Sequence, residues 1–128
     1  MTEKISRYDL KLIARDAGVK TTTVLTLLKG GVTFEAVDTV LELRNSLVSY
    51  DKDGNIRGQV TAATLCIGWK ACEGDIDVLN IVVDRALEIV HRRFTPDNYG
   101  CFHTNQWNFA LFSALRQYKR RGAAGLNQ

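Results

Sequence analysis

Apolar residues recur at helical spacing in three short segments near the start of the chain, which predicts helices over residues 8–17, 20–28 and 33–47. Their apolar positions are Leu10, Ile13, Ala14 and Ala17 in the first segment, Val24, Leu27 and Leu28 in the second, and Val37, Val40, Leu41, Leu43 and Leu47 in the third. Gly18 follows the first segment at once and suits the left-handed conformation that ends many helices. Thr33 is the expected cap of the third helix.

The very short connection between the first two segments constrains how they pack. Two helices joined by a single glycine turn must cross at a steep angle, and the third helix then closes a small core beneath them. This arrangement is a helix-turn-helix.

The middle of the chain predicts a β-hairpin. Asp53-Gly54 or Gly54-Asn55 is a strong turn signal, and apolar residues flank it in strands expected at 47–50 and 56–60. Residues 61–72 are ambiguous, but the spacing of their apolar positions favours a helix.

The rest of the chain predicts two longer helices. Asp75 is the expected cap of a helix that runs through Phe94, and its apolar stripe is wide enough to indicate burial on more than one side. A last helix is expected over residues 103–121, and the tail that begins at Gly122 is expected to be loose.

These elements predict a mainly α-helical protein in two parts. Residues 1–48 form an N-terminal tri-helical helix-turn-helix headpiece. Residues 49–128 form the β-hairpin together with a helical unit for packing and dimerisation.

Three motifs lie in the first two expected helices and the turn between them: Ile13-Ala14, Ala17-Gly18-Val19 and Thr23-Val24. Together with the third helix, the stretch over residues 9–47 resembles the DNA-binding headpiece of the LacI family of bacterial repressors. The resemblance implies that the second helix enters the major groove of double-stranded DNA. What remains of the chain is too short for the effector-sensing domain of that family, so the resemblance carries over the headpiece alone.

The resemblance also implies which side chains meet DNA. Short hydroxyl side chains at the start of the second helix can approach base edges or phosphates closely, and a helix N-terminus itself attracts phosphate. The expected base contacts are Thr21, Thr22 and Thr26. The expected phosphate contacts are Lys20, Thr23 and Lys29.

Charge adds a second candidate surface. The chain has 17 Lys and Arg against 14 Asp and Glu, a net charge of +3, and the excess is concentrated near the C-terminal end. The basic cluster at the C-terminal end is either a solvated helix end or a secondary phosphate-binding surface. The residues of that cluster are Arg116, Lys119, Arg120 and Arg121.

The sequence gives little indication of disulfide bonds, metal sites or catalysis. The three cysteines are odd in number and do not form a disulfide framework, and the cysteines and histidines lack the paired spacing of a zinc site. The turn at residues 51–55 lacks the glycine and glutamate positions of a calcium loop. No nucleophile–base constellation is visible. We therefore expect no metal, no cofactor and no enzymatic activity.

The segment at the N-terminus lacks the apolar stretch of a signal peptide, and no apolar run is long enough to span a membrane. A cytoplasmic protein is expected. A single helix-turn-helix contacts few base pairs, so specific binding normally requires a dimer. The sequence thus favours a small homodimeric transcription regulator, a repressor of a size that suits phage or plasmid control proteins.

Two alternatives remain open. In a winged arrangement the third helix would contact DNA and the hairpin would be its wing, although Glu35, Asp38 and Glu42 would face phosphate there. In the other, the helix-turn-helix is a protein-interaction module that inhibits or recruits a partner protein. Nearly balanced charge in the first 48 residues favours this second alternative.

Overall fold

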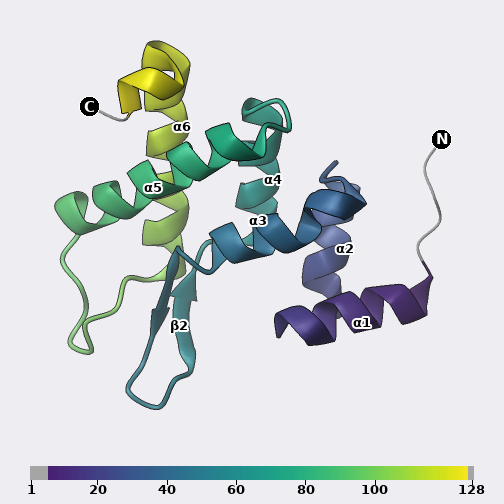
Figure 1. Cartoon of the computed structure of the whole chain (residues 1–128). Coiled ribbons are helices and arrows are strands. Elements are labelled where there is room, and N and C mark those ends of the chain that lie inside the picture. The colour runs from purple at the N-terminus through teal and green to yellow at the C-terminus, as the bar shows by residue number, and fades with distance from the viewer. Residues whose placement is uncertain (1–5, 127–128) are drawn as a thin grey trace.

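The elements follow one another in the order that the sequence predicts (Figure 1). The structure is a computed structural model that describes residues 6–126. Its elements are α1 (Arg7–Ala17), α2 (Thr21–Lys29), the 3-10 turn η1 (Phe34–Ala36), α3 (Val37–Arg44), β1 (Val48–Tyr50), β2 (Ile56–Gln59), α4 (Ala62–Ala71), α5 (Ile76–Arg93) and α6 (Thr104–Leu126). The mainly α-helical fold with one antiparallel hairpin is confirmed.

Local sequence sets both ends of α1. The Ser6 hydroxyl accepts a hydrogen bond from the backbone N–H of Asp9 at 3.1 Å. At the other end Gly18 adopts a φ of 69°, and the N–H of Val19 donates to the carbonyl of Ala14 at 2.9 Å. The predicted glycine turn between the first two helices is confirmed.

The third helix differs from its prediction at both ends. The Thr33 side chain makes no capping hydrogen bond, and the chain enters η1 before α3 begins. The helix ends at Arg44 and not at Leu47. The reason is that the carbonyl of Leu47 accepts a hydrogen bond from the N–H of Val60 at 3.0 Å, which draws this segment into the start of the hairpin.

The predicted hairpin is confirmed. Hydrogen bonds stabilise its turn, and close packing holds its base. At the turn, one carboxylate oxygen of Asp51 accepts from the N–H groups of Asp53 and Asn55 at 2.9 and 3.0 Å. At the base, a Cβ added to Gly58 would overlap the backbone of residues 102–103. Strand β2 therefore lies directly against the segment that leads into α6, which gives the two-stranded sheet the support it needs.

The helices of the second half also start where the sequence indicates. The Thr61 hydroxyl accepts from the N–H of Thr64 at 3.3 Å, so the ambiguous segment is helical. One oxygen of Asp75 accepts from the N–H groups of Asp77 and Val78 at 3.0 and 3.2 Å, which confirms the predicted cap of α5.

The prediction of a loose tail is wrong for residues 122–126. Gly122, with a φ of 74°, kinks α6, and the helical turn beyond it brings Leu126 into the core at 4% exposure. Burial of one leucine favours an ordered end that composition alone does not indicate. Residues 127–128 lie outside the described residues.

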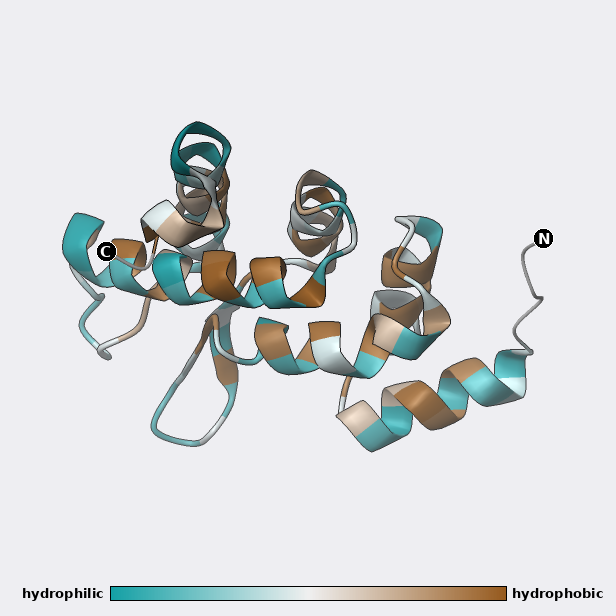
Figure 2. Ribbon diagram, turned by 45° about the horizontal axis from the view of Figure 1, so that its top comes forward, coloured by the Kyte–Doolittle hydropathy of each residue, from teal (hydrophilic) through white to brown (hydrophobic). Residues whose placement is uncertain are grey.

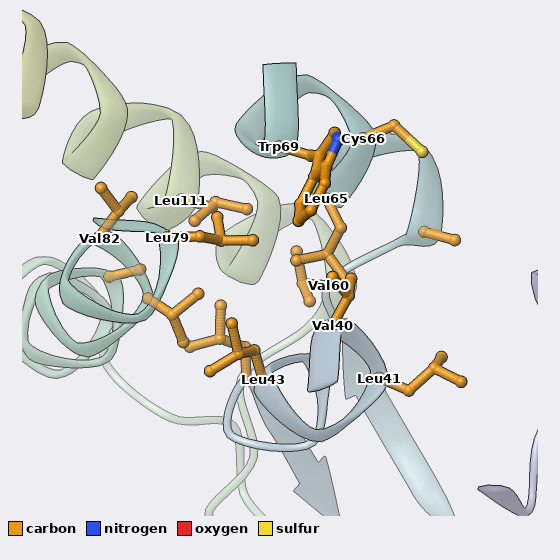
Figure 3. Close-up of a cluster of buried hydrophobic side chains, with 14 of the residues drawn as sticks. Val40, Leu41, Leu43, Val60, Leu65, Cys66, Trp69, Leu79, Val82 and Leu111 are labelled. Carbon is orange, nitrogen blue, oxygen red and sulfur yellow. The ribbon is translucent and has the colours of Figure 1, made fainter. Parts of the chain in front are cut away.

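The first three helices and the second half of the chain share one hydrophobic core. Figure 3 shows Leu65 and Trp69 of α4 near Leu79 of α5 and Leu111 of α6, with side chains of α3 beneath them. The indole N–H of Trp69 donates to the carbonyl of Gly31, beyond the end of α2, at 3.1 Å. The division of the chain at residue 48 into two parts stays a prediction.

Most of the wide apolar surface of α5 is covered within the chain, while Leu87 is 36% exposed. Helix α5 lies between α6 and α3 (Figure 2), and it also contacts α4. Its buried residues are Leu79, Val82, Val83, Ala86, Ile89 and Val90. Burial on more than one side is thereby confirmed. The homodimer stays a prediction.

Candidate nucleic-acid interface

Helix α2 has one buried side and one solvent-facing side. Val24 and Leu27 are fully buried beneath α1 and α3. The opposite side carries three of the six residues predicted to contact DNA, all exposed: Thr22, Thr26 and Lys29. Lys20, the residue just before α2, is exposed as well. The other two, Thr21 and Thr23, are half-buried at the margins of this face. We call these six residues the α2 surface.

Helix α4 packs against α2. The Cys66 thiol donates to the backbone carbonyl of Thr26 at 3.5 Å. A Cβ added to Gly30 would overlap the side chain of Cys66, so the two helices meet in close contact. This packing fixes the direction of α2, a property that a groove-binding helix requires. Sequence spacing does not indicate it, because α4 comes forty residues later in the chain.

The α2 surface has a favourable charge pattern for an anionic partner. Residues 19–34 include Lys20 and Lys29 and no acidic residue. No side chain caps the start of α2, where the helix dipole adds partial positive charge, and the N–H of Thr23 donates to the carbonyl of Lys20 at 3.0 Å. Phosphate is the anion that DNA presents to such a surface.

The hydroxyl of Thr26 has a defined role in hydrogen bonding. It donates to the backbone carbonyl of Thr22 at 2.8 Å. The hydroxyl oxygen can therefore still accept a hydrogen bond from a ligand, but its one proton is already used. In the major groove, adenine N6 and cytosine N4 are the base donors that match an acceptor. The geometry thus narrows what the predicted base contact at Thr26 can recognise.

A cleft of about 670 Å³ lies beside the start of α2. It runs between the α1–α2 turn, the end of α3 and the hairpin, with Lys20, Thr23 and Arg44 among its lining residues and no carboxylate among those described. Arg44 donates from Nε to the carbonyl of Val60 at 3.0 Å, and burial lowers the pKa of its guanidinium. Arg44 was not among the predicted site residues, since its place in the cleft depends on the hairpin.

The exposed side of α3 has the opposite charge. Asp38 and Glu42, together with Asp16 of α1, line a groove of about 370 Å³ between the two helices. A phosphate backbone would be repelled there. This distribution disfavours the winged arrangement, in which α3 would contact DNA.

The predicted secondary basic residues are all exposed on α6. Arg116 and Arg120 line a groove of about 240 Å³ between α5 and α6, while Lys119 faces a neighbouring hollow beside α4. The groove also takes three arginines of α5 that the prediction did not include: Arg85, Arg92 and Arg93. Sequence alone does not group them with α6, because the two helices approach each other only in the fold.

A polar cluster joins the hairpin to the loop before α6. Asp97 accepts hydrogen bonds from Arg57 at 2.7 Å and from His103 at 2.9 Å, and the Arg57 guanidinium lies 4.4 Å from the centre of the Tyr99 ring. The bond from Arg57 above all, with those from His103 and the backbone N–H groups of Cys101 and Tyr99, holds the pKa of Asp97 well below its usual range.

This depressed pKa predicts a pH-dependent contribution to stability. The contribution is fully present above the unfolded pKa of about 4 and is lost as the pH falls toward the lower folded value. Asp97→Asn is therefore expected to be less stable than the wild type at pH 7 and to differ less from it at pH 3. Urea unfolding at both pH values measures this, with Asp53→Asn at the hairpin turn as the control. Equal stability of Asp97→Asn and the wild type at pH 7 would contradict it.

All three cysteine side chains are buried, and none of them forms a disulfide bond. Burial raises the pKa of Cys66, and it raises the pKa of Cys72 to about 11, which leaves both as thiols near neutral pH. Across residues 6–126 no group of three or more His, Cys, Asp or Glu side chains is placed to hold a metal ion.

Comparison of the chain with protein-family models, curated proteins and solved structures found no match. Among the described helices, none combines the length and the apolar character that crossing a lipid bilayer requires.

Proposed function

We propose that this protein is a sequence-specific regulator of transcription that binds double-stranded DNA through the α2 surface. One observation carries the proposal: Thr22, Thr26 and Lys29 share the exposed side of a short helix whose other side is buried, and Lys20 is exposed just before its first residue. A helix held in this way can lie in the major groove with its N-terminal residues at the base edges.

The division of labour on the α2 surface follows from side-chain chemistry. Lys20 and Lys29 stand at the two ends of α2 and neutralise phosphates, which gives affinity without sequence preference. Thr22 and Thr26 lie between them and contact bases. Because one helix covers few base pairs, the protein acts as a homodimer on a two-fold site. Repression by occupancy of such a site is the action that we propose.

Binding to duplex DNA should weaken steeply with salt. With two lysine–phosphate contacts per protomer, the logarithm of the association constant is expected to fall with the logarithm of salt concentration with a slope of about −2 per protomer. Fluorescence anisotropy of the full chain against a pool of random-sequence duplexes, titrated from low to physiological salt, measures this slope. A binding constant that does not change with salt would contradict the proposal.

A second candidate is a protein-interaction module that binds no DNA. The groove lined by Asp16, Asp38 and Glu42 favours it, because an acidic surface beside the α1–α2 turn fits a basic protein and repels phosphate. Absence of duplex binding even at low salt would favour this candidate over the regulator.

A further inference from the structure

Five arginines gather where α5 and α6 cross, at the end of the molecule away from α2. Figure 2 shows hydrophilic colouring at the ends of both helices there, with α4 between this region and α2. We call the space between them the arginine groove, lined by Arg85, Arg92, Arg93, Arg116 and Arg120. Arg85 is held in place, since its Nε donates to the Gln117 side chain at 2.8 Å and its side chain is 14% exposed.

The positive charge of the arginine groove is poorly compensated. Glu88 is the one carboxylate that pairs with these arginines in the described chain, at 3.4 Å from Arg85 and 3.7 Å from Arg92. Arg93, Arg116 and Arg120 form no ion pair within residues 6–126. Guanidinium groups brought together in this way repel one another unless an anion binds among them.

An aromatic hollow adjoins the arginine groove on the same exposed side of α6. It measures about 450 Å³ and shares Ser113 and Arg116 with the groove. Phe109 and Phe112 line it and are 42% and 40% exposed. The Arg93 guanidinium lies 5.6 Å from the centre of the Phe109 ring, so the cationic and aromatic groups form one continuous surface.

We propose that the arginine groove and the aromatic hollow together bind single-stranded nucleic acid. The surface extends along α6 from Phe109 to Arg120, about 16 Å at 1.5 Å per residue, which is longer than one nucleotide unit. A single strand presents phosphates and unpaired base faces in alternation. Arginines bind the phosphates, and a base stacks on Phe112 beside Arg116.

Other occupants match this surface less well. A duplex hides its base faces, so the aromatic hollow contributes nothing to binding it. A second copy of the chain, placed across a two-fold axis, would bring two arginine grooves into mutual repulsion. The proposal does not depend on the duplex function of α2, because the two surfaces share no residue.

The test uses the full chain and a fluorescein-labelled thymidine oligonucleotide of about twelve nucleotides, followed by anisotropy at low salt. Arg116→Gln/Arg120→Gln should weaken binding by on the order of tenfold, and Phe112→Ala by about fivefold or more. The matched control is Arg7→Gln/Arg15→Gln, which removes two exposed arginines from α1 and should change affinity less than twofold. Far-UV circular dichroism verifies that each variant is folded.

Several results would overturn the proposal. These are no binding by the wild type, equal losses in the groove and control variants, or unchanged affinity for Phe112→Ala. Competition by a duplex or by thymidine monophosphate as effective as that of the oligonucleotide would overturn it as well. Loss of single-strand binding with retained duplex binding separates this surface from the α2 surface, and failure of either proposal leaves the other standing.

Discussion

Trp69→Ala is expected to lower the free energy of unfolding by about 3–5 kcal/mol. The Trp69 side chain is 8% exposed, packs against Gly74 and donates to the carbonyl of Gly31. Its loss leaves a cavity between α4 and the end of α2 and an unpaired carbonyl there. Urea unfolding followed by far-UV circular dichroism measures the change without depending on tryptophan fluorescence.

Two further variants test whether the loss of stability comes from the contacts of Trp69. Trp69→Phe keeps most of the volume and loses the hydrogen bond to Gly31, so a cost of about 1–2 kcal/mol is expected. Ile67→Ala removes a side chain that is 49% exposed on the same helix and should cost well under 1 kcal/mol. If Trp69→Ala cost no more than Ile67→Ala, or if α1–α3 unfolded in a separate transition, the shared core would be contradicted.

Features fixed by near neighbours in the chain are the ones that sequence predicts well. Gly18 ends α1 because a left-handed residue is needed there, and Asp75 begins α5 because its carboxylate satisfies two free N–H groups. The turn at Asp51 is closed by its own side chain. Each of these depends on contacts within about four residues, so composition and spacing were sufficient.

Features fixed by distant contacts were not predictable in this way. The apolar spacing of α3 continues to Leu47, but pairing with Val60 ends the helix earlier. The composition of the tail indicates no order, yet Leu126 is drawn into the core. In both places a tertiary contact outweighs the local preference of the chain.

The same division applies to the candidate site. The resemblance indicates Lys20, Thr22, Thr26 and Lys29 among the DNA contacts, and all four are exposed in the structure, whereas Thr21 and Thr23 are half-buried. The support from α4, the position of Arg44 in the cleft and the arginines of α5 come from elements far away in the chain. No spacing rule groups such residues before the fold is known.

The second large effect is expected for Lys20→Ala/Thr22→Ala. This variant removes one phosphate contact and one base contact from exposed positions, so the fold should persist while duplex affinity falls about 10- to 100-fold. The slope of binding against salt should also become shallower by about one unit per protomer. Both changes follow from the proposal that α2 lies in the major groove.

The most direct test compares that variant with Lys52→Ala/Thr39→Ala in one anisotropy titration against duplexes selected by the wild type from a random pool. The second variant also removes one lysine and one threonine, but from the hairpin and α3, so total charge is matched. The account predicts that affinity falls in the α2 variant and stays within about twofold of the wild type in the other. Loss in the hairpin and α3 variant with binding retained in the α2 variant would contradict it and assign the DNA contact to a winged arrangement.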